Sequence, residues 1–212
     1  MISYAQRRED VRLMTLLGHV DDGFYIDVGA WHPVDQSVTK VFYDRGWSGV
    51  NVEPQTSYFE LLCQSRPRDI NLNVAIAAEE GPVSLWVPRY SALATCRADY
   101  LDESIADYRD ATESRVDSCT LDSIFNTYAS AKDVHFLKVD IEGLEEAVIC
   151  GTDFRRYRPW ILVVEATSPH TGEPMWQSWE PWLIECDYRV VDFDGLNRFY
   201  VRCESIELLQ PN

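Results

Sequence analysis

The sequence predicts an α/β protein built on a doubly wound, mostly parallel sheet of seven strands that ends in a C-terminal antiparallel hairpin. Three observations support this fold class. Short apolar runs alternate with segments of helical periodicity. Several of these runs end at an acidic residue, an asparagine or a glycine, and the turn sequence Asp194-Gly195-Leu196-Asn197 separates the last two. A length of 212 residues suits one domain, which we place at 1–212.

The predicted strands are short runs rich in valine, isoleucine, leucine and aromatic residues. In chain order, the parallel strands are expected at 24–28, 49–53, 70–75, 134–139 and 160–164. The closing hairpin is expected at 188–193 and 198–201. An extra strand is expected at 83–87, where apolar and polar residues alternate.

Helices are expected between the strands, where apolar residues recur every three or four positions. The predicted helices are 36–45, 56–63, 121–128, 144–150 and 176–186. Trp176, Trp179 and Trp182 share one face of the last helix. We interpret them as a core stripe, with a sugar-stacking platform as the alternative.

Two segments fall outside this alternation. Residues 1–20 form an N-terminal cap, in which Tyr4, Gln6 and Asp10 either close over a ligand or belong to a surface helix. Residues 88–113 show no steady period. An irregular segment of this length is either a lid inserted over the functional site or a surface excursion.

The charge balance narrows the range of partners. The chain has 19 basic and 35 acidic residues, which gives a net charge of −16. Such an acidic body repels phosphate backbones and anionic membrane surfaces, so nucleic acid is not expected as a partner. The most apolar run, 160–164, ends at Glu165 and is too short to span a membrane, so membrane insertion is not expected either.

The cysteines indicate a reducing compartment. Six cysteines are present and neighbouring ones are at least 17 residues apart, which excludes CxxC motifs and zinc-type spacings. A chain of this size does not need a disulfide framework, and its polar N-terminus does not read as a signal peptide. We therefore expect reduced thiols in a cytoplasmic protein.

The ends of the first two predicted strands indicate an adenosine-containing ligand. Gly29 follows the first strand, where glycine lets the backbone turn sharply and approach a ligand. Glu53 ends the second strand, where a carboxylate can accept both ribose hydroxyl hydrogens. The loop at 29–33 has one glycine followed by bulky residues and a proline, which suits a pyrophosphate poorly. A ligand without phosphate, such as S-adenosylmethionine (SAM), fits better.

Several motifs carry a resemblance to a known family. The most specific are Lys138-Val139-Asp140-Ile141-Glu142-Gly143 and Asp194-Gly195-Leu196-Asn197-Arg198-Phe199-Tyr200, with Tyr25-Ile26-Asp27-Val28-Gly29-Ala30 and Asn51-Val52-Glu53-Pro54 in support. The sequence resembles the FkbM-type methyltransferases, a class I, SAM-dependent O-methyltransferase family. The similarity runs from about residue 3 to residue 203.

The resemblance implies a set of cofactor-binding positions. Asp27 and Gly29 would border the methionine part of SAM, and Ala30 would also bind the cofactor. Glu53 would bind the ribose, and Asn73 and Val74 would lie near the adenine. Gln6, in the N-terminal segment, is also expected at the cofactor. These seven residues are the predicted SAM site.

The resemblance also bears on the acceptor. Members that end in the Asp194–Tyr200 motif often accompany glycosyltransferases of surface polysaccharide pathways, and other members methylate macrolide hydroxyls. Trp31 stands where the family commonly has asparagine, which suggests an aromatic wall at this position.

Acidic residues at two later strand ends are the candidate catalytic groups. Asp140 and Glu165 follow neighbouring predicted strands, so both carboxylates are expected beside the transferred methyl group. A hydroxyl acceptor is a weak acid and needs either a general base or a metal ion. Asp140 and Glu165 could supply the base and its orienting partner, or bind Mg²⁺ through hard oxygen ligands. Glu142 is either a third catalytic residue or a cap of the helix after it.

Three further residues are candidates for substrate binding. His32 follows Trp31 and either lines the pocket or is a packed loop histidine. Asn197 and Arg198 flank the hairpin turn and bind either a sugar or its phosphate-bearing carrier. Their alternative role is turn chemistry, because asparagine tolerates a left-handed backbone.

The sequence thus predicts a SAM-dependent O-methyltransferase that acts on a hydroxyl, most readily that of a sugar in glycan biosynthesis. One alternative is an NAD-dependent oxidoreductase, which the missing second and third glycines disfavour. Another is a non-catalytic nucleotide- or glycan-binding module. If the protein methylates or binds a glycan, a glycosyltransferase is the expected partner or fused domain. The sequence indicates no oligomeric state.

Overall fold

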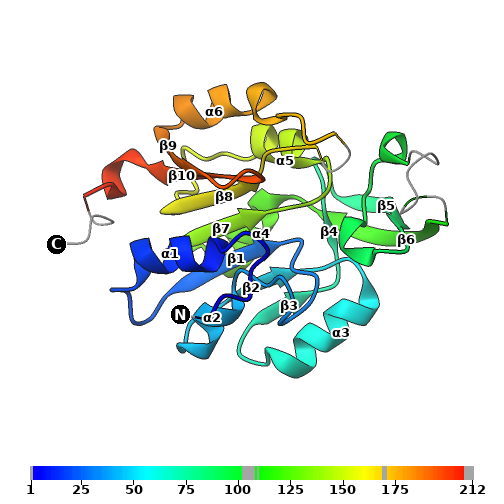
Figure 1. Ribbon diagram of the computed structural model, residues 1–212, viewed down its shortest axis with the longest axis horizontal. Coiled ribbons are helices and arrows are strands. Elements are labelled where there is room, and N and C mark those ends of the chain that lie inside the picture. The colour runs from blue at the N-terminus through cyan, green and yellow to red at the C-terminus, as the bar shows by residue number, and fades with distance from the viewer. Residues whose placement is uncertain (1, 102–107, 109, 169–170, 208–212) are drawn as a thin grey trace.

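The computed structural model describes residues 2–101, 108, 110–168 and 171–207. Its main sheet has seven strands in the order β3-β2-β1-β7-β8-β10-β9 (Figure 1). These strands are β1 (Phe24–Val28), β2 (Ser48–Val52), β3 (Ile70–Leu72), β7 (Phe136–Val139), β8 (Ile161–Glu165), β9 (Tyr188–Phe193) and β10 (Asn197–Arg202). Strand β10 runs antiparallel to β8 and β9, and the other pairs are parallel. The predicted α/β class with a mostly parallel sheet is confirmed.

The helices connect these strands and differ from prediction mainly in their bounds. They are α1 (Glu9–Leu17), α2 (Lys40–Asp44), α3 (Thr56–Ser65), α4 (Leu121–Tyr128), α5 (Glu145–Gly151) and α6 (Glu180–Glu185). The predicted helix 36–45 was too long, because Gln36 has a φ of 56° and cannot belong to a right-handed helix. The predicted helix 176–186 divides into a 3₁₀ turn at Trp176–Ser178 and α6. Pro181 lies in the first turn of α6, where its missing N–H is tolerated.

A second, three-stranded sheet projects at one end of the molecule and was only partly predicted (Figure 1). It contains β4 (Ala75–Ile76), β5 (Gly81–Val87) and β6 (Thr112–Cys119). The predicted strand 70–75 was wrong as a single element, because the chain leaves the main sheet after Leu72 and enters this one. Strand β6 was missed. Its side chains are mostly exposed, so it carries no apolar alternation.

The hydrophobic core forms two clusters on opposite faces of the main sheet. On β1, Ile26 and Val28 join the cluster that receives α4, α5 and α6, whereas Tyr25 joins the cluster that receives α1 and α2. Alternate side chains of one strand thus face two helical layers. Trp179 is 1% exposed in the first cluster, and the partly buried Trp176 and Trp182 pack against that cluster, so the three tryptophans face the core although they do not share one continuous helix.

Two expectations about the environment can be compared with the structure. All six cysteines are unpaired. Among the helices of the described ranges, none combines the length and apolar character that crossing a membrane requires.

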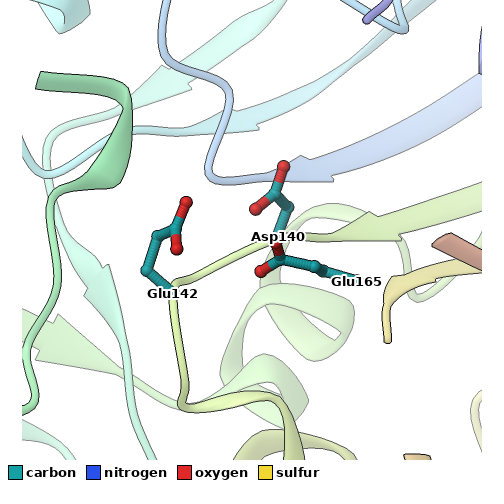
Figure 2. Close-up of side chains that lie close together, drawn as sticks. All are labelled: Asp140, Glu142 and Glu165. Atoms are coloured by element: carbon teal, nitrogen blue, oxygen red, sulfur yellow. The ribbon is translucent and has the colours of Figure 1, made fainter. Parts of the chain in front are cut away.

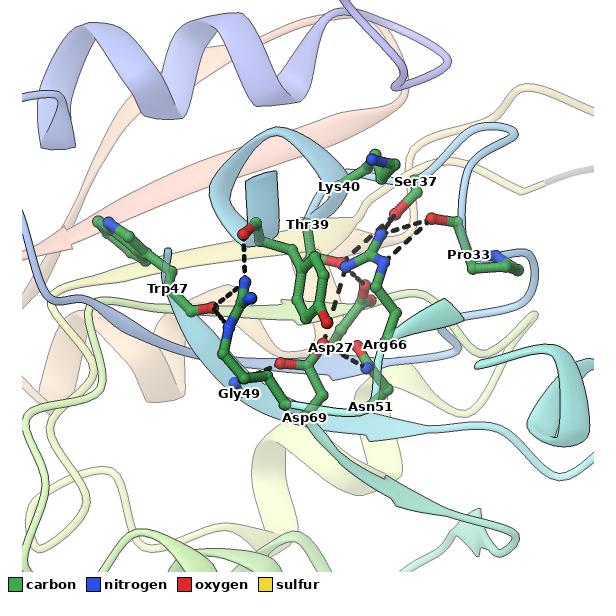
Figure 3. A network of polar contacts seen from close by, with 12 residues as sticks. Asp27, Pro33, Ser37, Thr39, Lys40, Trp47, Gly49, Asn51, Arg66 and Asp69 are labelled. Atoms are coloured by element: carbon green, nitrogen blue, oxygen red, sulfur yellow. Dashed lines mark hydrogen bonds and ion pairs between the residues drawn. The ribbon is translucent and has the colours of Figure 1, made fainter. Parts of the chain in front are cut away.

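A buried arginine anchors the loop that leads from β1 to α2 (Figure 3). The Arg66 side chain is 1% exposed and lies 3.7 Å from the Asp69 carboxylate. Its guanidinium donates to the Pro33 carbonyl oxygen at 2.5 Å and to the Ser37 hydroxyl at 3.0 Å. The end of α3 is thereby bonded to the loop that carries residues 29–37.

Asp69 extends this network across the sheet. Its carboxylate accepts hydrogen bonds from the Tyr25 hydroxyl at 2.6 Å, the Asn51 amide at 2.9 Å and the Gly49 N–H at 2.9 Å. Tyr25 belongs to β1, whereas Gly49 and Asn51 belong to β2. The Arg66–Asp69 pair therefore connects the two strands whose carboxyl ends form the functional site.

We expect Arg66→Met to lower the free energy of unfolding by about 3–5 kcal/mol, because the buried Asp69 carboxylate would lose its cation. Urea unfolding followed by circular dichroism measures the change. Arg155→Met is the matched control: the Arg155 side chain is 60% exposed and lies 3.7 Å from Glu185. Such an exposed pair contributes at most about 1 kcal/mol. Equal losses in the two variants would contradict a structural role for Arg66.

Candidate active site

A pocket lies at the carboxyl ends of β1, β2 and β7. Strand β1 separates β2 and β3 on one side from β7 and β8 on the other, and sheets of this kind bind ligands at such a switch point. Several residues predicted from the sequence line this pocket: Gln6, Gly29, Ala30, Glu53, Val74, Asp140 and Glu142.

Gly29 makes the turn from β1 into the pocket wall. Its φ is +78°, and a Cβ added there would lie 1.8 Å from the backbone oxygen of Asp140. The N–H groups of Gly29 and Ala30 both donate to the Val52 carbonyl oxygen at 3.1 Å. Only glycine fits this position, because the ends of β1 and β7 approach each other at backbone distance.

Glu53 is fixed at the end of β2 by backbone amides. One carboxylate oxygen accepts from the Trp31 N–H at 2.8 Å and the other from the Gln55 N–H at 2.8 Å. The residue is 2% exposed, and burial raises the pKa of Glu53 to about 7. Each oxygen keeps a lone pair for a further hydrogen bond.

The predicted adenine residues behave differently from each other. Val74 lines the pocket. The Asn73 side chain instead donates to the backbone oxygens of Glu53 and Pro54 at 3.0 Å and 2.9 Å. Asn73 therefore holds the chain after β2, and it is not among the pocket-lining residues.

A buried lysine lines the pocket. The Lys138 ammonium donates to the Gly29 carbonyl oxygen at 2.7 Å and lies 3.5 Å from Asp27 and 3.3 Å from Asp140. Burial alone would lower its pKa, but the carboxylates of Asp140 and Asp27 outweigh burial and raise it. Asp27, predicted at the cofactor, is 1% exposed and bonds to Thr39 at 3.0 Å. It does not line the pocket, so it acts on the site through Lys138.

Three carboxylates converge beside the pocket (Figure 2). Asp140 follows β7, Glu142 lies in the loop before α5, and Glu165 ends β8. One oxygen of each lies within 4.8 Å of the others. Burial, followed by the repulsion of the Asp140 carboxylate, raises the pKa values of Glu142 and Glu165 well above the ordinary range.

The alternative role of Glu142 as a helix cap is wrong, because Leu144 occupies the N-cap position of α5 and one Glu142 carboxylate oxygen has no hydrogen-bond partner among the described residues. The Glu145 carboxylate accepts from the N–H groups of Ile141 and Gly143, each at 2.9 Å. Glu142 has a φ of 51° and Gly143 a φ of 104°, so the chain reverses between strand and helix. This reversal turns the Glu142 side chain toward Asp140 and Glu165 (Figure 2).

Comparison with protein families decides the classification. The model of the FkbM methyltransferase domain matches residues 27–190, which is well over half of the chain. The chain belongs to the FkbM methyltransferase family. Comparison with curated proteins returned no match. The FkbM match begins at Asp27 and contains the strand ends with Glu53, Asp140 and Glu165, so it supports a methyltransferase at this pocket.

In this FkbM domain, the side chains predicted to bind substrate form hydrogen bonds or ion pairs with other residues of the chain. None of them lines the pocket. His32 accepts from the N–H groups of Val34 and Asp35 at 3.2 Å and 2.9 Å, which makes it a loop residue. Arg198 forms an ion pair with Glu180 at 2.7 Å. The structure gives no support to direct substrate contacts by His32 or Arg198.

Asn197 connects β10 to the N-terminal segment. Its side chain donates to Glu9 at 2.9 Å, and its backbone lies opposite Glu165 in the sheet. Glu9 is 3% exposed and lines the pocket next to Gln6. Glu9 was not predicted from the sequence, in which residues 1–20 were expected either to close over a ligand or to form a surface helix. Asp10 instead binds the Ser3 hydroxyl and the Tyr4 N–H.

The first part of the predicted lid contributes to the pocket. Ala92, Ala94 and Cys96 line it, and the Trp31 indole donates to the Ser91 hydroxyl at 3.2 Å. Trp31 itself is a lining residue, as an aromatic wall requires. Residues 102–107 and 109 of the predicted lid lie outside the described residues.

Proposed function

We propose that the protein transfers a methyl group from SAM to a hydroxyl, that of a sugar in glycan assembly. The observation that carries this proposal is the electrostatic character of the pocket. Glu9, Glu53, Asp140 and Glu142 line it, whereas Lys138 is the one basic lining residue in the described ranges. A cationic sulfonium ligand suits such a pocket, and a pyrophosphate does not.

The residues present fit SAM. Glu53 can accept hydrogen bonds from both ribose hydroxyls, because two backbone amides already orient it. Gly29 lets the ends of β1 and β7 approach each other at backbone distance in the pocket wall. Val74, with Ile76 and Leu85, supplies apolar walls for an adenine. When bound, SAM supplies an electrophilic methyl group.

The carboxylates activate the acceptor. In the proposed reaction, Asp140 holds the hydroxyl toward the cofactor, and a carboxylate of the cluster takes its proton. A buried carboxyl with a raised pKa suits this role, because its proton affinity is closer to that of the hydroxyl. The acceptor is a neutral, hydroxyl-rich molecule, since the net charge of −16 disfavours polyanions.

The setting is proposed from the same features. Six unpaired cysteines fit a cytoplasmic location, where thiols stay reduced. A glycosyltransferase, as partner or fused domain, would supply or extend the glycan. This part of the proposal rests on the family resemblance of the Asp194–Tyr200 motif.

The test is calorimetric titration with S-adenosylhomocysteine (SAH), with NAD⁺ as the paired control. Micromolar binding of SAH and none of NAD⁺ is expected. Binding of NAD⁺ alone would instead favour an oxidoreductase, although Lys138 is already occupied by Gly29, Asp27 and Asp140. SAH binding without methylation of any glycan acceptor would favour a non-catalytic module.

Glu53 makes SAH affinity depend on pH. Its pKa is raised to about 7, and only the ionised carboxylate accepts both ribose hydroxyls. Ligand binding must therefore expel a proton below pH 7. We expect the Kd for SAH to rise about tenfold for each pH unit below about 7 and to level off above it. Calorimetry between pH 5.5 and 8.5, spanning roughly three units, measures this.

Glu53→Gln is the control for this pH dependence. The amide cannot ionise, so the variant should bind SAH about 10- to 100-fold more weakly at pH 8 and lose the slope between pH 6 and 7. An equal slope in both proteins would assign the titration to another group, such as Glu9, whose pKa burial also raises.

A further inference from the structure

We propose that Asp140, Glu142 and Glu165 bind one hard divalent cation, of the Mg²⁺ class, beside the cofactor pocket. One oxygen of each carboxylate lies within 4.8 Å of the others (Figure 2). Oxygen ligands of Mg²⁺ or Ca²⁺ lie about 2.0–2.6 Å from the ion, so two ligands of one ion are at most about 4–5 Å apart. The three side chains therefore already have the spacing of a shared coordination sphere.

Unsatisfied oxygens point to a missing positive partner. One oxygen of Glu142 and one of Glu165 are fully buried and have no hydrogen-bond partner among the described residues. The two residues are only 6% and 4% exposed. A buried, unpaired carboxylate oxygen is costly. A cation within the cluster satisfies both oxygens at once.

The surrounding protein leaves these carboxylates available. Glu145 accepts the N–H groups of Ile141 and Gly143 in the loop before α5, so these amides do not occupy the Glu142 carboxylate. The backbone of Glu142 has a φ of 51°. Such strain in a residue other than glycine is typical of functional sites. Lys138 forms an ion pair with Asp140 at 3.3 Å. Among the described residues, it forms none with Glu142 or Glu165.

The ligand set identifies the class of cation. Three carboxylates and no cysteine or histidine select hard ions such as Mg²⁺, Mn²⁺ and Ca²⁺ over Zn²⁺. The Asp140 side chain is 34% exposed, so the site is open toward the pocket. The positions that the protein leaves free would take water or the hydroxyls of a sugar diol. That catalytic use rests on the proposed function, but cation binding does not.

The experiment titrates the full chain with MnCl₂ and follows free Mn²⁺ by electron paramagnetic resonance. We expect one Mn²⁺ per chain with a Kd below about 1 mM, displaced by Mg²⁺. Glu142→Gln and Glu165→Gln should each weaken binding by about tenfold or more. Glu146→Gln is the matched control, because Glu146 is an exposed acid in the first turn of α5 and should leave Kd unchanged.

Thermal unfolding excludes a merely structural effect. In metal-free protein, the two glutamine variants should unfold at or above the wild-type Tm, because each removes repulsion within the cluster. Mn²⁺ should raise the Tm of the wild type and of Glu146→Gln alone. Absence of saturable Mn²⁺ binding, an unchanged Kd in the cluster variants, or a lower metal-free Tm would each overturn the cation site.

SAH titration of the same preparations separates the two proposals. Binding of SAH without Mn²⁺ binding overturns the cation site and leaves the methyltransferase function standing. Binding of Mn²⁺ without SAH binding supports the cation site and overturns the proposed function.

Discussion

Asp140→Asn is expected to lower turnover by about 10²–10⁴-fold while changing the Kd for SAH by no more than about threefold. Asp140 is the most exposed member of the acidic cluster and the one that Lys138 contacts. Its amide keeps the shape of the side chain but loses the charge that orients a hydroxyl or binds a cation. The proposed cofactor contacts of Gly29 and Glu53 do not involve this carboxylate, so affinity for SAH should persist.

The measurement is SAH release in a coupled assay, with an acceptor found by screening neutral glycosides and oligosaccharides. Asp21→Asn serves as the control, because Asp21 is an exposed acid in the loop before β1. Turnover near the wild-type rate in Asp140→Asn would remove this carboxylate from the mechanism. A parallel loss of SAH affinity would instead show that Asp140 supports the cofactor pocket.

The position of the site was predictable because it follows from the order of the strands. Parallel strands end at the same edge of a sheet, so acids after the strands at 49–53, 134–139 and 160–164 had to lie near one another. Glu53 and Asp140 line the pocket, and Glu165 joins Asp140 in the cluster. The pattern of apolar runs is therefore enough to predict where the site lies.

Register and loop conformation were not predictable in the same way. In the sequence, Lys138 is a single polar residue within an apolar strand. Only the pairing of β1 with β7 places it opposite Asp27. The direction of Glu142 depends on its positive φ and on Glu145, which accepts the N–H groups of Ile141 and Gly143 in the same loop. Neither feature has a periodicity that a single sequence displays.

Residue type alone did not show which protein groups the polar side chains bind. Asn197 is a reasonable sugar ligand by chemistry, but its amide binds Glu9 from the other end of the chain. His32 had the right chemistry for a pocket, but its ring nitrogen accepts amides of its own loop. Such non-local or backbone partners emerge only from the folded chain. The N-terminal segment thus completes the pocket although it lies outside the matched range.

Gly29→Ala is expected to weaken SAH binding by at least about 100-fold, or roughly 2.7 kcal/mol. The methyl group would lie 1.8 Å from the Asp140 backbone oxygen, so the end of β7 or of β1 must move. The positive φ of +78° adds about 1–2 kcal/mol of strain for alanine. Either movement disturbs the loop that leads to Glu53 and the position of Asp140. Calorimetry measures the Kd, and circular dichroism confirms that the variant is folded.

Gly46→Ala separates the steric clash from the backbone strain. Gly46 also has a positive φ, +102°, but an added Cβ would meet nothing within 4 Å. This variant should lose about 1–2 kcal/mol of stability and bind SAH within about threefold of wild type. If Gly29→Ala behaved like Gly46→Ala in both respects, the contact between the ends of β1 and β7 would not be what shapes the pocket. A loss of affinity confined to Gly29→Ala places the cofactor at that contact, as the proposed function requires.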